Sequence, residues 1–325
     1  MILSEREGEG KPASRNLFRR LIRGIFSWLL QTHIEVAASC PLLTDDGDRY
    51  HSMLDGSIAK PFKKKKYQFV YRIDTPTGCF YLKRTAYQSP RSILRHLLRG
   101  RRAHTDSGWE YLAVLALQSR GFRVMQPCGF GEQQWLRLWP RRGFLLVREV
   151  LGKDLGELLL AGDAALRSEA FSALGHYMGR LHGSGFFHAA RVHDFIYDRA
   201  GDDKGCKLRL TMIDLDFKGI LPVPCPFDAS MAIEALAESC YVFLRVGYRA
   251  NKAETHRFFR GYKFGLRSFG QKLPPKHLNA LAGAVTRRLR KLAQDPDWLA
   301  VFPEAPNSLE DAFLQPTCKG NPYEG

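Results

Sequence analysis

Short β-type runs give way to long helical segments near Gly152, and few folds accommodate that order. Before this point, QFVYRIDTPTGCFYLKRT contains two β-type runs around a Thr-Pro-Thr-Gly turn, which predicts a β-hairpin. VMQPCGFGE and FLLVREVLG predict two further strands. After it, LRSEAFSALGHYMGRLHGSGF carries apolar residues at helical spacing and stops at glycines. The chain is therefore predicted to be an α+β protein with a small β-rich lobe followed by a larger helical lobe.

Within the β-rich part, the pattern from Pro90 to Arg120 is helical, with a basic first half. Its second half has an apolar face formed by Tyr111, Leu112, Val114 and Leu115. We expect four parts along the chain: an accessory segment at 1–50, the two lobes at 51–150 and 151–300, and a tail at 301–325.

The accessory segment contains an amphipathic stretch, LFRRLIRGIFSWLLQ, from Leu17 to Gln31. Its apolar run is too short and too charged to span a bilayer. Two interpretations remain open and are equally favoured by the pattern: a helix that lies in a membrane interface, with Phe26 and Trp28 at the acyl boundary, or a helix packed against the body of the protein.

The formal net charge of +16 favours anionic partners such as phosphorylated glycans, acidic lipid surfaces or nucleic acid. No recognition motif, zinc finger or aromatic-basic platform supports specific binding of nucleic acid. The lysines at 63–66 could contact phosphates, but such a run more often protects an exposed strand edge. Seven scattered cysteines and a polar start without a secretion signal predict reduced thiols and a cytoplasmic location.

A strand lysine is followed, 27 positions later, by a helix glutamate, and phosphoryl transfer uses both residue types. Lys83 lies in FYLKRT, and Glu110 lies near the start of the helical stretch WEYLAVLALQ. Transfer from ATP needs a lysine on the phosphates and an acid that holds this lysine. Each signal is weak alone, because most strand lysines and helix glutamates face solvent, so their order and separation carry the information. We predict that Glu110 pairs with Lys83.

Two carboxylates follow the apolar run LRLTMI. Asp214 ends this run, and Asp216 comes two residues later on the same face. A carboxylate at the end of a buried strand suits a hard divalent cation such as Mg²⁺. The alternative is that both side chains cap the strand end through backbone amides. The preceding stretch FIYDRAGDDKGCKLRLTMI predicts strand, polar turn and strand, a hairpin that brings the loop before it next to Asp214.

The ordered set YLKR, GWEYLAVLALQSRGF, PCGFGE, FLLVREVLGKDLGELL, LGHYMGRLHGSGFFH and MIDLDF resembles the lipopolysaccharide core kinases, the Kdo and heptose kinase family. The resemblance runs from about Tyr67 to Tyr262 and includes a later FFRGY. It implies a two-lobed protein-kinase-like fold with the active site between the lobes, and ATP and Mg²⁺ as cofactors. It also implies an anionic core glycolipid as acceptor, and action at the cytoplasmic face of the inner membrane.

By this resemblance, Lys83 binds the ATP phosphates, Glu110 pairs with it, Glu149 borders the adenine pocket and Asp214 binds magnesium. The glycine-rich loop expected of such a fold is degenerate, because the predicted hairpin contains only Gly78.

The catalytic loop departs from the family pattern. Where the family has His-x-Asp, this chain has His188, Ala189 and Ala190, and an alanine cannot accept the proton of the acceptor hydroxyl. Asp194 falls at the place of the second metal ligand and could bind magnesium or act as a substitute base. The imidazoles of His188 and His193 are further candidates for the base, because imidazole titrates near neutral pH, although a structural role is favoured for His188.

Three interpretations follow. The first is an active sugar kinase, since positioning and electrostatics carry most of the catalysis in phosphoryl transfer. The second is a pseudokinase that binds nucleotide or glycolipid and regulates a partner. The third, a nucleic-acid-binding protein, is supported by the net charge and by the basic stretch HLLRGRRAH. The retained lysine, glutamate and metal aspartate favour the kinase.

Overall fold

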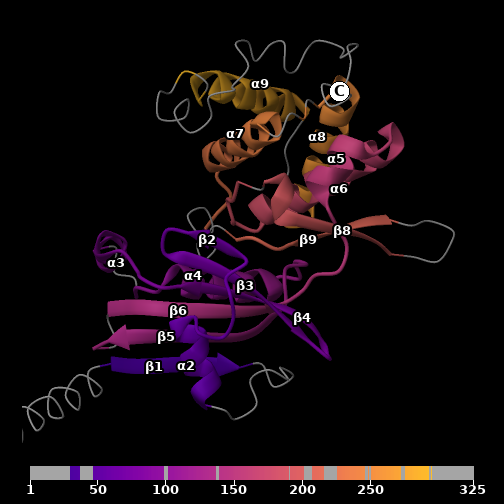
Figure 1. Cartoon of the computed structure of the whole chain (residues 1–325). Coiled ribbons are helices and arrows are strands. Elements are labelled where there is room, and N and C mark those ends of the chain that lie inside the picture. Colours follow the sequence, from indigo (N-terminus) through magenta and orange to yellow (C-terminus); the bar gives the residue numbers. More distant parts are fainter. Residues whose placement is uncertain are drawn as a thin grey trace, which may run out of the picture. The chain divides into compact units, whose positions relative to one another are not determined.

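The computed structural model describes most of the chain: residues 30–36, 47–98, 102–136, 139–189, 191–200, 207–215, 225–245, 248, 250–271, 275–292 and 294. The protein forms two compact units (Figure 1). The first lies within Met1–Tyr111 and Pro127–Arg148, and the second lies within Leu112–Gln126 and Glu149–Gly325. The chain therefore leaves the first unit inside a helix, returns to it at Pro127 and leaves it again after Arg148.

The first unit is built on a six-stranded antiparallel sheet with the order β1-β5-β6-β4-β3-β2. Its strands are β1 (Leu30–Val36), β2 (Lys63–Lys65), β3 (Gln68–Thr75), β4 (Gly78–Thr85), β5 (Pro127–Trp135) and β6 (Trp139–Arg148). The predicted hairpin is confirmed as β3 and β4, and the two further predicted strands are confirmed as β5 and β6. The lysine run lies on β2, at one edge of the sheet.

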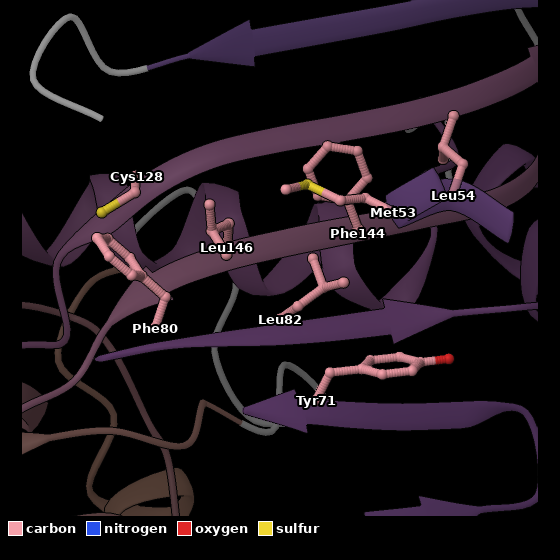
Figure 2. Close-up of a cluster of buried hydrophobic side chains, with 8 residues drawn as sticks. All are labelled: Met53, Leu54, Tyr71, Phe80, Leu82, Cys128, Phe144 and Leu146. Atoms are coloured by element: carbon pink, nitrogen blue, oxygen red, sulfur yellow. The ribbon is translucent and has the colours of Figure 1, made fainter. Parts of the chain in front are cut away.

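One face of this sheet packs against α2 (Gly47–Asp55). Directly opposed residues of neighbouring strands point to the same face, so the row Tyr71, Leu82 and Leu146 forms a continuous apolar surface. Figure 2 shows the buried cluster that joins this row to the helix: Met53, Leu54, Tyr71, Phe80, Leu82, Cys128, Phe144 and Leu146. The residues between them, including Lys83, point to the other face, where they meet α4 (Asp106–Gln118).

The helical pattern predicted from Pro90 to Arg120 is wrong in its middle. It forms two helices, α3 (Pro90–Leu97) and α4, and the residues at 102–105 between them are not helical. The hydroxyl of Thr105 accepts a bond from Gly108 N at 3.2 Å, a side-chain cap that starts α4 as a separate helix. The predicted apolar face is also incorrect at Leu115, which is exposed, whereas Ala113 and Leu117 are buried.

The strand β1 differs from the prediction for the accessory segment. Most of the helix predicted from Leu17 to Gln31 lies outside the described residues, but its last two residues belong to β1, which pairs with β5. The alternation of apolar and polar residues in LQTHIEV suits a strand, and the free edge of β5 supplies its hydrogen-bonding partner. None of the described helices is long and apolar enough to cross a membrane.

The second unit combines helices with a small antiparallel sheet of order β7-β8-β9 (Figure 1). Its elements are β7 (Lys153–Asp154), α5 (Leu155–Ala161), α6 (Ala164–Gly183), η1 (Val192–Asp194), β8 (Phe195–Ala200), β9 (Lys207–Met212), α7 (Ala229–Arg245), α8 (Lys252–Arg267) and α9 (Pro275–Leu292). The long helix predicted after Gly152 is confirmed as α6, and the second predicted hairpin is confirmed as β8 and β9.

The helices α6 and α8 meet at glycines spaced four residues apart, which form one face of each helix: Gly175, Gly179 and Gly183 on α6, and Gly261 and Gly265 on α8. A Cβ atom on Gly179 would lie 2.1 Å from the carbonyl oxygen of Tyr262, and one on Gly261 would lie 2.3 Å from that of Ser172. The two backbones are therefore in direct contact, and a side chain at Gly175, Gly179, Gly261 or Gly265 would force them apart.

A buried polar contact lies beside this crossing. His182 Nδ1 and the hydroxyl of Tyr262 share a hydrogen bond of 2.9 Å. Burial lowers the pKa of His182 to about 3, so its ring is neutral at physiological pH. The contact therefore fixes the register of the two helices without bringing a charge into the core.

We expect Gly179→Ala to lower the free energy of unfolding by about 1–3 kcal/mol, because the added methyl group overlaps a backbone carbonyl. This loss should outweigh the helix propensity of alanine, which favours it over glycine by about 1 kcal/mol. Thermal unfolding followed by circular dichroism measures the change. Gly283→Ala on α9 is the matched control, since its Cβ would meet only the end of the Arg287 side chain at 3.4 Å. Equal midpoints for the two variants would contradict the backbone contact.

Candidate active site

The ion pair predicted between Lys83 and Glu110 is present in the first unit. Lys83 lies on β4, in the interior of the sheet, and its Nζ is 2.5 Å from Oε1 of Glu110 on α4. The two side chains are only 19% and 12% exposed. Charge-assisted contacts of this kind strengthen when water is excluded. The ammonium group is thus held in place on the α4 face of the sheet.

Hydrogen bonds to β4 fix the first turn of α4 beside this lysine. The Ser107 hydroxyl donates to the carbonyl oxygen of Lys83 at 3.1 Å, and Ser107 N donates to the Thr85 hydroxyl, also at 3.1 Å. Asp106 accepts a bond from Gln68 on β3 at 2.9 Å. Glu110 lies one turn further along, so these contacts set its distance from the lysine.

A buried carboxylate anchors the start of α4 from the other side. Glu132 on β5 is 1% exposed and accepts a bond from Thr105 N at 2.5 Å. Its other oxygen bonds His104 Nδ1 at 3.0 Å and accepts a bond from Gln134. Burial by itself raises the pKa of Glu132, but the hydrogen bonds and the charge of His104 outweigh this effect, so the pKa is below its ordinary value.

The roles of Glu132 and His104 were not predicted from the sequence. The only local signal is an acidic residue at the end of the buried run CGFGE, because an unpaired carboxylate rarely occupies such a place. The partners lie 27 and 28 positions away along the chain, so the sequence alone does not reveal them.

In the second unit, the loop that follows α6 leads to the short helix η1. Gly185 has a φ of +86°, and a Cβ there would lie 1.9 Å from the carbonyl oxygen of Cys225, so only glycine fits. His188 is buried, with 2% of its surface exposed, which suits the structural role favoured for it. Ala190, the residue at the expected place of the catalytic aspartate, lies outside the described residues.

The backbone brings Asp194 and Asp214 into the same neighbourhood. Ile213 N donates to the carbonyl oxygen of Asp194 at 2.8 Å, directly before Asp214. The Asp194 side chain is buried, and its Oδ2 accepts a bond from Arg191 N at 3.0 Å. The Asp214 side chain is exposed. Asp216 lies outside the described residues, so its part in the site stays a prediction.

The His193 side chain contacts Asp154. Its Nδ1 lies 3.1 Å from Oδ1 of Asp154, and its side chain is 55% exposed. The same Asp154 oxygen caps α5 by accepting bonds from Gly156 N and Glu157 N. The contact therefore ties η1 to the start of α5.

The described residues contain no group of three or more His, Cys, Asp or Glu side chains placed to hold a metal ion. A phosphate-bound Mg²⁺ does not require one, because it takes one or two carboxylates and completes its coordination with water and phosphate oxygens. Asp194 and Asp214 carry carboxylates, the type of oxygen donor that such an ion takes. Glu149 follows β6 directly, at the point where the chain enters the second unit.

The polar anchor of α4 leads to a prediction on pH. We expect Glu132→Gln to lower the free energy of unfolding by about 1–3 kcal/mol, because the neutral amide replaces the charged acceptor of several buried donors. Because the pKa of Glu132 is lowered from 4.5, its contribution is complete above about pH 4.5 and is lost as the pH falls further.

The difference in unfolding midpoint between the wild type and Glu132→Gln should therefore shrink from about pH 6 to about pH 3. Differential scanning calorimetry across this range provides the test. Glu157→Gln, which changes an exposed carboxylate, is the control and should show a difference near zero. A difference for Glu132→Gln that stays constant down to pH 3 would refute the assignment.

Comparison with known proteins is consistent with this geometry. Residues 69–262, more than half of the chain, match the model of the lipopolysaccharide kinase (Kdo/WaaP) family. No curated protein sequence matches significantly. Among solved structures, WaaP in complex with acyl carrier protein is similar with a TM-score of 0.57 and 15% identity, covering 80% of this chain and 98% of that chain. The likeness to WaaP shows a shared fold.

Two other solved structures have lower TM-scores. The pseudokinase domain of BIR2, an immune regulator of the RLK/Pelle family, has a TM-score of 0.36 and 13% identity, with 91% of this chain and 96% of that chain covered. The bifunctional kinase-methyltransferase WbdD has a TM-score of 0.37 and 13% identity, with 79% and 51% covered. The family model matched over residues 69–262 carries the assignment: the chain has a kinase-like α+β fold and belongs to the lipopolysaccharide kinase (Kdo/WaaP) family.

Proposed function

We propose that the protein is an ATP-dependent kinase that phosphorylates an inner-core sugar of lipopolysaccharide, either Kdo or heptose. Membership of the family supports this reaction class. The observation that carries the proposal is the ion pair of 2.5 Å between Lys83 and Glu110, which prepares a lysine for phosphate binding on an interior strand of the sheet. Lysine is rarely this buried without a charged partner, and Glu110 supplies that partner from a helix.

Each retained residue has a proposed part in nucleotide binding. Lys83 contacts the phosphates and Glu110 orients its ammonium group. Asp214 and Asp194 supply carboxylate oxygens to Mg²⁺, and Asp216 is a further candidate ligand. Glu149 borders the adenine. ATP, when bound, supplies the γ-phosphoryl group, and the protein contributes positioning and charge stabilisation.

The proposed transfer proceeds without the usual catalytic aspartate, because Ala190 occupies its place. Correct positioning of the acceptor and phosphate accounts for most of the rate in such reactions. Of the three candidate substitutes, His188 is buried and His193 is bonded to Asp154. The carbonyl oxygen of Asp194 accepts a hydrogen bond from Ile213 N, directly before Asp214, so we propose Asp194 first as a metal ligand and second as a base.

A pseudokinase is the second candidate, and the alanine at position 190 is the observation that favours it. In this case Lys83 and Asp214 are retained for nucleotide binding alone, and the protein acts as a regulatory scaffold. Magnesium-dependent ATP binding without transfer would distinguish this function from an active kinase.

The proposed acceptor and location follow from charge and family. An anionic core glycolipid suits a protein with a net charge of +16, and we propose a cytoplasmic protein that associates peripherally with the inner membrane. The solved WaaP structure contains acyl carrier protein, so we include an acyl carrier protein among the proposed partners. Co-elution of the two purified proteins in size-exclusion chromatography tests this partner, and separate elution at micromolar concentration would exclude it.

The test of the function is transfer of labelled γ-phosphate from ATP to purified core lipopolysaccharide in the presence of Mg²⁺. We expect wild-type protein to transfer the label, and Lys83→Ala and Asp214→Ala each to lower the rate by about 100-fold or more, because each removes a charge that acts on the transferring group. Asp194→Ala reports whether that residue contributes to the same site.

Lys252→Ala and Asp74→Ala change exposed residues of the same types and should retain wild-type rates. Circular dichroism should show that all variants are folded. Transfer that survives Asp214→Ala would refute the assigned metal site. Absence of transfer to any core acceptor, together with Mg²⁺-dependent ATP binding, would favour the pseudokinase.

A further inference from the structure

We propose that the first unit carries a docking surface for an anionic lipid membrane. This surface consists of the β2–β3 hairpin, the adjoining Tyr87 and the outward face of α3. Its exposed apolar side chains are Phe62, Tyr67, Tyr87, Leu94 and Leu98. Lysines and arginines lie among them. The proposal concerns only the first unit and does not depend on kinase activity.

The outward face of α3 exposes leucine where a surface helix normally places polar residues. Arg91, Leu94, Arg95 and Leu98 follow the spacing of a single helix face. Leu94 is 51% exposed and Leu98 is 79% exposed, whereas Ile93, on the opposite face, is buried. The helix is therefore anchored through Ile93 and presents two leucines flanked by two arginines.

The β2–β3 hairpin continues this surface. It turns at Lys66 and Tyr67, and Tyr67 packs edge-on against Tyr87 with ring centroids 5.1 Å apart. Ala86 N donates to the carbonyl oxygen of Tyr67 at 2.8 Å. Since α3 begins three residues after Tyr87, at Pro90, the hairpin turn and the helix are neighbours in one unit. Phe62, just before β2, is 74% exposed.

The stretch of chain that contains this surface is strongly basic. From Gly56 to Leu98 it has ten lysines and arginines and one acidic residue, Asp74. Among them, Lys83 is paired with Glu110, and Asp106 accepts hydrogen bonds from Gln68 and Gln88 beside Tyr67 and Tyr87. Protection of the edge strand β2 accounts for lysines at 63–66. It does not account for the exposed rings and leucines beside them, which cost free energy in water unless a partner covers them.

Lipid is the occupant that these features favour. Aromatic rings and leucines that alternate with basic side chains match the boundary between acyl chains and anionic headgroups. Lysine is depleted from protein–protein interfaces, whereas this hairpin is rich in it. Long basic side chains can also reach headgroup phosphates while the apolar groups between them insert.

The substituted side chains of α3 are separate from the lysine of the candidate active site. The helix packs against α4 through His96, whose ring stacks on that of Trp109 with centroids 4.6 Å apart. Arg91, Leu94, Arg95 and Leu98 are exposed, whereas Lys83 and Glu110 are largely buried. We therefore expect substitutions at these four positions to leave the Lys83–Glu110 ion pair in place.

Flotation of the full-length protein with vesicles tests the proposal. The vesicles are pure phosphatidylcholine, or phosphatidylcholine with about one third phosphatidylglycerol. We expect binding to the anionic vesicles alone and a decrease of this binding at high salt. Leu94→Ser/Leu98→Ser and Arg91→Gln/Arg95→Gln should each lower the partition coefficient by about tenfold.

Matched controls change exposed residues of the same types in the second unit. Leu151→Ser/Leu160→Ser and Arg257→Gln/Arg260→Gln should bind as the wild type does. Unchanged unfolding midpoints confirm that the α3 variants are folded. Phe26→Ser/Trp28→Ser measures the contribution of the amphipathic stretch near the start of the chain.

Two results would overturn the proposal. In the first, the α3 variants bind vesicles as the wild type does, whether or not Phe26→Ser/Trp28→Ser loses binding. In the second, the wild type binds poly-L-glutamate but not anionic vesicles, and the α3 variants lose that binding, which would assign the surface to an acidic protein.

Discussion

The backbone contact between α6 and α8 is the constraint on which the second unit depends. Glycines at Gly175, Gly179 and Gly261 let the two helices approach until carbonyl oxygens occupy the space that side chains would fill. Such an approach has little tolerance, since a packed core resists even small changes of volume. The neutral pair of His182 and Tyr262 fixes the register of the crossing. The end of α6 is thereby held in place, and the loop toward Asp194 begins there.

In the first unit, buried polar groups hold a helix in place. At the start of α4, the Glu132 carboxylate accepts a hydrogen bond from Thr105 N and is bonded to His104 Nδ1. These bonds fix the position of the helix that carries Glu110. Buried polar networks are costly when incomplete, so a fully bonded one selects a single arrangement. The ion pair with Lys83 is then a consequence of where α4 begins. A backbone contact in the second unit and a buried polar network in the first therefore hold the charged groups of each unit in place.

The retained and the lost parts of the kinase pattern have different physical requirements. A lysine for phosphates and carboxylates for Mg²⁺ act through charge, and their removal would abolish nucleotide binding as well as transfer. The catalytic aspartate mainly orients the acceptor hydroxyl, and this task can pass to other groups that position the acceptor. A basic, partly apolar surface on the first unit would add to that positioning if the acceptor is embedded in a membrane.

The sequence by itself determined the features that depend on local pattern and chain order. The hairpin of β3 and β4 and the helix α6 follow from periodicity and turn residues. The pairing of Lys83 with Glu110 was predicted from the order of the two residues together with the family resemblance. Only the tertiary structure decided the features that need a distant partner. Leu30 and Gln31 continue an amphipathic pattern and yet form a strand, because β5 offers an edge for hydrogen bonding. The break between α3 and α4 is likewise linked to a distant residue, because Thr105 in this break donates a hydrogen bond to the buried Glu132 on β5. No local sequence pattern contains that information.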